Sequence, residues 1–250
     1  IMFDYLQYLS VLFLISFGII IHKYEDKYPL ENFKRLKTFK FDMVSIMIST
    51  LFVLFILDFL LNENIISFIH STFSLGPSIS EWPTYICLIM ALIVGDFGYY
   101  LTHRFLHLRQ MWNAHQFHHS TINIYWFSGL RTSFINSLLI RIPYLIGFQM
   151  FEISYEIVSA AGIFLLVINF WIHSNLNLKY DKFLSYIFIT PNFHRLHHVN
   201  DEQVAGCNFG NIFSVWDHIF GTALISDDWQ KSPKGEYISW KKFPRRIIGF

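Results

Sequence analysis

Five apolar stretches constrain the fold of this chain more than any other feature. Each approaches the roughly 17–25 residues that a helix needs to cross a bilayer, and they cover about 5–21, 43–61, 84–101, 134–151 and 155–172. Of the 250 residues, 53% are hydrophobic and 15% are charged, whereas soluble domains carry about 45–50% apolar and roughly 25% charged residues. We therefore expect an all-α, multi-pass integral membrane protein.

The number of spans depends on the fourth stretch, because Arg141 lies inside it. A charge at that depth favours a kinked or partly re-entrant segment, so we expect four to five transmembrane helices. Residues 152–154 leave room only for a tight turn between the fourth and fifth stretches. No basic segment precedes the first stretch and no small-residue cleavage site follows it, which favours a membrane helix over a cleavable signal.

The basic residues lie almost entirely on one side of this predicted topology. Of the 19 Lys and Arg residues, all but Arg141 fall before the second stretch, between the third and fourth, or after the fifth. Residues 62–83, between the second and third stretches, contain none. By the positive-inside rule the basic side is cytoplasmic, in a bacterial inner membrane or the endoplasmic reticulum.

The tail over residues 174–250 is too rich in aromatic side chains for a disordered segment. We expect it to form a cytoplasmic cap of short helices that lies on the membrane. The two cysteines, Cys87 and Cys207, are far apart, which argues against a disulfide framework, a zinc ribbon or a thiol relay.

Histidines gather in three motifs and one single position, all on the predicted cytoplasmic side. The motifs are an HxxxH at 103–107, an HxxHH at 115–119 and a second HxxHH at 194–198, and the single residue is His173. On a helix, residues three or four apart share one face, so each motif presents neighbouring imidazoles. Nine imidazoles exceed the four to six ligands of one ion, and the pattern predicts a histidine-rich dimetal site. Imidazole suits iron, zinc, copper and nickel, so ligand type leaves the metal open.

Three further histidines lack such neighbours. His22 is expected at the membrane interface, His70 on the opposite side, and His218 in a structural turn. We expect none of them to bind metal.

The motifs and their spacing resemble the fatty acid hydroxylase/sterol desaturase superfamily. The matching segments are DFGYYLTHRFLH at 96–107, MWNAHQFHHS at 111–120, TPNFHRLHH at 190–198, NFG at 208–210 and WDHIFGT at 216–222. The resemblance covers about residues 90–225. It implies a single membrane domain over 1–250, with transmembrane helices to about residue 95, a catalytic region over about 96–225 and a basic tail over about 226–250. It also implies two iron ions, for which zinc can substitute in purified protein, bound by His103, His107, His115, His118, His119, His173, His194, His197 and His198.

The activity implied by the resemblance is O2-dependent hydroxylation or desaturation of a membrane lipid, such as a fatty acyl chain or a sterol. Two departures, Cys207 where many relatives carry an acid and His218 where they carry Arg or Lys, leave the substrate subclass open. No GxGxxG, CxxC or haem-binding segment is visible, so electrons are expected from an external donor of the cytochrome b5 or ferredoxin type. The basic tail at 241–246 suits either that donor or anionic lipid headgroups. No nucleic acid partner is expected, and the oligomeric state stays open.

Supporting residues are predicted beside the ligands. Asp96 and Tyr100 lie on the same helical stripe as His103 and His107. Asp96 either accepts a hydrogen bond from a ligating histidine or pairs with an arginine. Asn175, like Asn192, suits a metal-bound water as well as a cap or turn.

Asp217 suits a helix cap or tail packing better than catalysis. The alternatives to an oxygenase are a membrane zinc-dependent hydrolase and a non-catalytic metal- or haem-binding membrane protein. A zinc hydrolase normally carries HExxH with Glu as general base, and none of the three motifs contains that Glu. Haem proteins and metal transporters place histidines within spans, whereas these lie at helix ends or in the tail.

Overall fold

The computed structural model is all-helical over the residues that it describes, which are 2–33, 39–79, 81–201, 204, 206–229 and 232–250. Those residues contain three isolated β-bridges and no strand. The longer helices are α1 (Met2–Lys27), α2 (Phe39–Leu60), α3 (Glu63–Phe73), α4 (Thr84–Leu106), α7 (Ile142–Met150) and α8 (Tyr155–Ile172). The shorter ones are α5 (Trp112–Gln116), α6 (Phe134–Leu139), α9 (Asp181–Leu184), α10 (Pro191–His197), α11 (Val215–Ile219) and α12 (Phe243–Ile248), with 3₁₀ turns η2 (Gly76–Ile79), η3 (His118–Ser120) and η4 (Trp126–Leu130).

Three described helices are long and apolar enough to cross a membrane, namely Lys40–Leu60, Thr84–Leu106 and Tyr155–Ile172. They correspond to the second, third and fifth predicted stretches, and the fifth has the predicted bounds. The third extends five residues beyond its prediction and so carries His103 on the same helix. The first predicted stretch lies within α1, and the side chains of its residues up to 11 are outside the described part of the chain.

The fourth predicted stretch is broken into α6 and α7 on either side of Arg141. Pro143, in the first turn of α7, explains the break. Its ring removes one backbone donor and clashes with the carbonyl four residues earlier, at Leu139, where α6 ends. The predicted tight connection to the fifth stretch is present, because α7 ends at Met150 and α8 begins at Tyr155.

Helix α7 packs closely along α4, and glycines allow the approach. A Cβ added at Gly147 would lie 2.5 Å from the carbonyl oxygen of Ala91, and one added at Gly95 would lie 2.5 Å from the ring of Tyr144. Small residues at such crossings let two backbones approach within a membrane. Helices α4 and α7 are therefore closely packed, and the C-terminal part of the chain is attached to this pair by hydrogen bonds to Asp96 and Tyr144.

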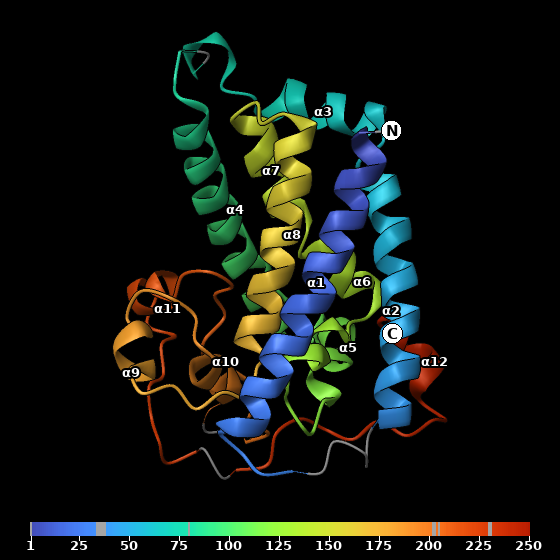
Figure 1. Ribbon diagram of the computed structural model, residues 1–250, viewed down its shortest axis with the longest axis vertical. Coiled ribbons are helices and arrows are strands. Elements are labelled where there is room, and N and C mark those ends of the chain that lie inside the picture. Colours follow the sequence, from blue (N-terminus) through green and yellow to red (C-terminus); the bar gives the residue numbers. More distant parts are fainter. Residues whose placement is uncertain (1, 34–38, 80, 202–203, 205, 230–231) are drawn as a thin grey trace.

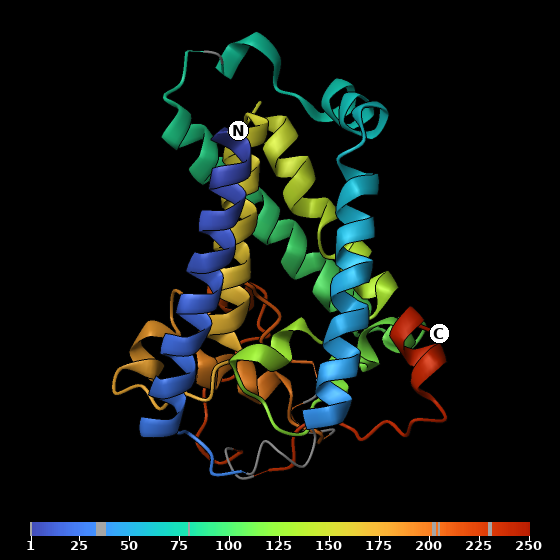
Figure 2. The same cartoon turned by 45° about the vertical axis from the view of Figure 1, so that its right-hand side comes forward.

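The short helices α9, α10 and α11 gather at one end of the long helices, and α3 lies across the other end (Figure 1). The same separation is visible after a 45° turn, where α12 lies beside α2 (Figure 2). Four basic residues that entered the charge argument, Lys34, Arg35, Lys37 and Lys231, fall outside the described residues. The two HxxHH motifs and His173 lie at the end that holds the short helices.

Candidate metal centre

Five of the nine predicted ligands form one cluster, which we call the five-histidine group. It consists of His103 and His107 at the end of α4, His115 on α5, His119 on η3 and His197 on α10. One nitrogen of each ring lies within 4.8 Å of the corresponding nitrogens of the others. All are buried except His107, which is partly exposed.

The other four form a second cluster, the four-histidine group. Its members are His118 on η3, His173 directly after α8, and His194 and His198 in and after α10. All four are buried, and their candidate ligand atoms also lie within 4.8 Å of one another. His22, His70 and His218 belong to neither group.

The two HxxHH motifs divide between the groups in opposite ways. In the first motif, His115 and His119 share the five-histidine group and His118 turns to the other. In the second, His194 and His198 share the four-histidine group and His197 turns back. In both, the pair spaced by four residues stays together because these positions lie on one face. The second motif is oriented by Thr190, which caps α10 by accepting from the Phe193 amide, and by Pro191 in the first turn.

Oxygen acceptors fix the protonation of five rings. The Nδ1 atoms lie at hydrogen-bonding distance from the following oxygens: His103 to Phe209 O at 2.8 Å, His115 to Asn136 Oδ1 at 2.7 Å, His118 to Arg131 O at 3.0 Å, His173 to Asn169 O at 2.9 Å and His197 to Cys207 O at 2.7 Å. These oxygens can only accept, so each Nδ1 carries the proton. A neutral imidazole has one N–H, and the Nε2 atoms of these five rings are therefore unprotonated.

Unprotonated Nε2 atoms face each other in both groups. The Nε2 atoms of His103 and His115 lie 2.9 Å apart, and those of His118 and His173 lie 3.2 Å apart. With both Nδ1 atoms protonated, neither contact can be a hydrogen bond between neutral rings. Two imidazoles that bind one ion at about 2.0–2.1 Å and at a right angle place their nitrogens about 3.0 Å apart. The residues present thus fit a cation in each group.

The remaining separations follow the same pattern. The Nε2 atom of His119 lies 3.1 Å from that of His115 and 3.0 Å from that of His197. The Nε2 atom of His194 lies 3.1 Å from that of His173 and 3.2 Å from that of His198. The buried Nε2 atom of His107 has no hydrogen-bond partner.

Burial keeps these rings neutral. It lowers the pKa of His118 to about 4 and that of His197 to about 3. Burial, followed by the neighbouring imidazoles, lowers the pKa values of His115 and His119 well below the usual range. Neutral imidazole is the form that binds metal.

A loop held by Asp217 supplies the acceptor for His103. The Asp217 carboxylate accepts hydrogen bonds from the amides of Phe209 and Gly210 at 2.7 and 2.9 Å, and from the Thr222 hydroxyl at 2.7 Å. The predicted packing role of Asp217 is thus a specific one, because it positions the Phe209 carbonyl. The nearby Cys207 contacts His197 through its backbone carbonyl. The presence of Cys207, where many relatives carry an acid, therefore leaves that contact intact.

Two ion pairs that involve buried arginines behind the groups escaped the sequence-based prediction. Arg131, whose carbonyl accepts from His118, pairs with Asp42 of α2 at 3.1 Å. Arg195, between two candidate ligands on α10, pairs with Glu31 at 3.1 Å and is 1% exposed. A lone acid at the start of an apolar stretch and an arginine inside the HxxHH motif were the signals available in the sequence.

The structure gives the predicted supporting residues different partners from those expected. Asp96 accepts hydrogen bonds from the Tyr144 hydroxyl, the amides of Ile212 and Phe213 and the indole of Trp216, at 2.8 to 3.1 Å. It contacts neither a histidine nor an arginine among the described residues. Its carboxylate instead fastens the 212–216 segment to α4 and α7.

Tyr100 and Asn175 also serve connections within the protein. The Tyr100 hydroxyl shares a hydrogen bond of 3.1 Å with the Thr222 hydroxyl. The Asn175 side chain accepts from the Glu31 amide and from Arg195, at 2.9 and 3.2 Å, and donates to the Glu31 carbonyl. Asn175 therefore ties the segment after α1 to the segment that carries His173.

Comparison with known proteins agrees with this geometry. Residues 88–222, more than half of the chain, match the fatty acid hydroxylase family. The chain is 34% identical over 128 residues to an alkylglycerol monooxygenase of Xenopus tropicalis, covering 51% of this chain and 28% of the relative. It is 30% identical over 148 residues to an ornithine lipid hydroxylase of Rhizobium tropici, covering 57% and 43%.

A methylsterol monooxygenase of Gallus gallus is 25% identical over 156 residues, covering 60% of this chain and 50% of the relative. The chain thus spans from about a quarter to half of the length of these relatives. No solved structure matches it. The family match encloses all nine clustered histidines, and the chain belongs to the fatty acid hydroxylase family.

Proposed function

We propose that this chain is a membrane-bound oxygenase that hydroxylates a lipid with O2 at two iron ions held by nine histidines. The observation that carries the proposal is the pair of facing, unprotonated Nε2 atoms in each group, at 2.9 and 3.2 Å. Such lone pairs repel unless a cation lies between them. The two groups have no residue in common, which supports two ions, one in each group.

The choice of iron rests on the family and on the donor set. The described residues of both groups are imidazoles only, which suits iron but also zinc, copper and nickel. When bound, two iron ions supply the chemistry that activates O2 for attack on an unactivated C–H bond. The chain's own residues hold the rings in one protonation state, keep them neutral and surround them with buried side chains.

The substrate class is inferred from the relatives. Their names specify an alkylglycerol, an ornithine lipid and a methylsterol, which are all lipids. Each is named a monooxygenase or hydroxylase, which favours hydroxylation over desaturation. A panel of these three lipids is therefore the rational first set of substrates.

The membrane arrangement that we propose has α1, α2, α4 and α8 as spans and the α6–α7 pair as a broken fifth segment. The distribution of Lys and Arg supports a position of the nine histidines at the cytoplasmic face. An external cytoplasmic protein would supply electrons. Trp112 offers a route for these electrons from the protein surface to the five-histidine group. Its side chain is partly exposed, and its ring lies 5.2 Å from that of His107 and 5.1 Å from that of His119.

Elemental analysis of detergent-purified protein, followed by product analysis, tests this function. We expect two irons per chain after expression with iron supplementation. Reconstitution with a reductant, O2 and each lipid of the panel should yield a product heavier by one oxygen, labelled from ¹⁸O2. Zinc alone, with exchange during expression excluded, would favour a hydrolase, and protein without metal despite supplementation would refute the proposal.

A further inference from the structure

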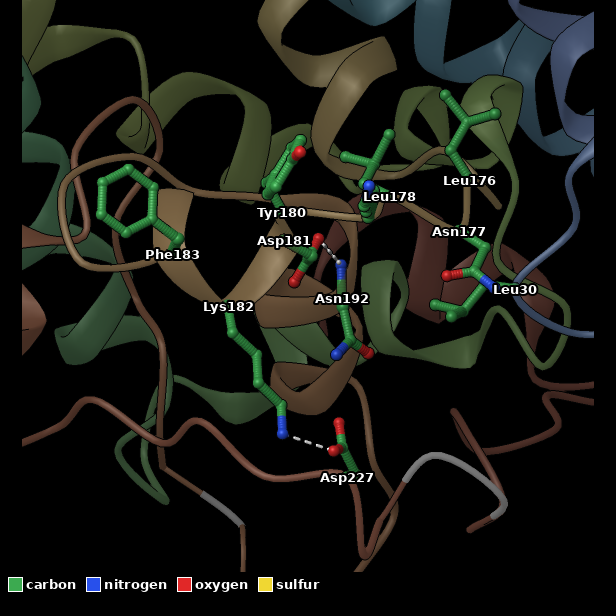
Figure 3. Close-up of a pocket in the computed structure, with 11 residues that line it drawn as sticks. Leu30, Leu176, Asn177, Leu178, Tyr180, Asp181, Lys182, Phe183, Asn192 and Asp227 are labelled. Atoms are coloured by element: carbon green, nitrogen blue, oxygen red, sulfur yellow. Dashed lines mark hydrogen bonds and ion pairs between the residues drawn. The ribbon is translucent and has the colours of Figure 1, made fainter.

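A second candidate site lies on the far side of α10 from the histidine groups. It is a cavity of about 340 Å³ whose lining includes Leu176, Leu178, Asp181, Lys182, Asn192 and Asp227 (Figure 3). We call it the α9–α10 cavity. Asn192 and His194 are two positions apart on α10, so their side chains point roughly 200° apart around the helix axis. The cavity is therefore separate from the four-histidine group to which His194 belongs.

Asn192 is the unusual member of the lining. Its side chain is 8% exposed, and the carboxamide oxygen is buried without a hydrogen-bond partner. Buried polar atoms in native proteins are nearly always paired, and leaving one unpaired is costly. The backbone amide of the same residue is engaged by Asp181 at 3.4 Å, so the unmet requirement is for a donor to the side-chain oxygen.

Charges of both signs line the same cavity. Asp181 and Asp227 bring carboxylates, and Lys179 and Lys182 bring ammonium groups. Lys182 and Asp227 form an ion pair whose side chains are 59% and 54% exposed. Exposed pairs of this kind contribute little, so Lys182 can turn to another anion at small cost. This combination of charges suits a zwitterionic ligand.

Most of the remaining lining residues of the cavity are apolar or aromatic. Leu30 follows α1 by three residues and Leu176 follows α8 by four, so the cavity adjoins the ends of two long helices. Tyr180 and Phe183 border it and are 63% and 75% exposed. Exposed aromatic rings near helix ends are typical of the interface between membrane and water. The ligand should therefore be an amphiphile.

We propose that the α9–α10 cavity binds the headgroup of a zwitterionic phospholipid that carries a primary ammonium group. The ammonium donates to the Asn192 oxygen and to Asp181, and the phosphate pairs with Lys182. The glycerol backbone and one acyl chain extend along the leucine wall, which consists of Leu30, Leu176 and Leu178. This site has a structural or regulatory role, and lipid binding there does not depend on the oxygenase reaction.

The test compares two lipids that differ only in the methylation of the ammonium group, and therefore in the ability to donate a hydrogen bond. Native mass spectrometry of the detergent-purified chain would measure binding of phosphatidylethanolamine and of phosphatidylcholine with the same acyl chains. Choline has no N–H, so wild-type protein should prefer phosphatidylethanolamine, by about tenfold for one charged hydrogen bond. Asn192→Leu leaves Asp181 as the remaining acceptor and should reduce that preference, whereas Asn64→Leu, at an exposed position on α3, should leave it unchanged.

Two further measurements keep the test decisive. Lys182→Ala, at an exposed position, should weaken both lipids alike because both carry the phosphate. Free phosphoethanolamine should bind more weakly than the lipid, since the leucine wall then remains empty. Equal binding of the two lipids by wild type, an unchanged preference in folded Asn192→Leu, or phosphoethanolamine binding as tightly as the lipid would overturn the proposal.

Discussion

His118 and His119 are neighbours in the chain, yet their rings belong to different groups. The Nε2 atom of His119 faces that of His197 at 3.0 Å, whereas the Nε2 atom of His118 faces that of His173 at 3.2 Å. His197 and His198 divide in the same manner. Two pairs of adjacent residues, His118–His119 and His197–His198, therefore link the two groups. A displacement of the backbone at either pair moves one ring in each group.

Single replacements should remove one metal ion and leave the other. His173→Ala takes a ligand from the four-histidine group only, and His197→Ala takes one from the five-histidine group only. We expect each variant to retain the ion of the intact group by elemental analysis, and the double variant to lose both. His70→Ala, in neither group, is the control and should bind as wild type. Complete loss of metal in both single variants would show one shared site instead of two.

Metal removal should destabilise the protein. Without a cation, the facing Nε2 lone pairs of His103 and His115 repel at 2.9 Å. Ligands that bind only the folded state stabilise it by about 4 kcal/mol when present at about 1,000 times Kd, so a chelator should lower the thermal unfolding midpoint. Addition of ferrous iron under anaerobic conditions should restore it. The His173→Ala/His197→Ala double variant should show no response to chelator.

Asp217→Asn should weaken metal binding without touching a ligand. The Asn amide keeps one acceptor oxygen and presents an NH₂ to the amide of either Phe209 or Gly210, so one of these two donors loses its acceptor and the Phe209 carbonyl that orients His103 is displaced. Loss of such a supporting contact typically costs about 10–100-fold in metal affinity. Competition with a chelator would measure the effect, which should be confined to one of the two ions. The exposed Asp228→Asn is the control.

The α4–α7 crossing gives a prediction about stability. Gly147→Ala places a methyl group 2.5 Å from the Ala91 carbonyl, and overpacking of this kind costs about 1–3 kcal/mol. Gly162→Ala on α8 is the matched control, because a Cβ there meets no atom within 4 Å. It should change the unfolding free energy by less than about 1 kcal/mol. Equal denaturant midpoints for the two variants would contradict the close crossing.

Hydropathy and residue spacing predicted those features of the structure that depend on the local sequence pattern. The bounds of α8 follow from hydropathy, and the nine histidines that cluster are those indicated by the motif spacing together with the family resemblance. The division into five and four does not, because it depends on how η3 and α10 turn relative to each other. The Nδ1 acceptors also escaped prediction, since four of the five are backbone carbonyls and carry no side-chain signature.

The interruption at Arg141 was foreseen as a kink, but its cause lies two residues later, at Pro143. The prediction of the hydrogen-bond partners of Asp96 was wrong for a related reason. An acid on the same stripe as two histidines predicts a hydrogen bond to one of them, but the 212–216 segment returns from far along the chain and takes the carboxylate. Contacts between residues more than 100 positions apart cannot be read from local spacing.

The late position of α10 bears on how the protein is made. Neither group is complete until the ribosome has passed His198, and the carbonyl that orients His103 is added later still, at Phe209. Helices α4 and α8 are therefore synthesised before either histidine group is complete. Under the proposed function, metal binding is then a late step that follows the synthesis of most of the chain and depends on the cellular supply of the ion.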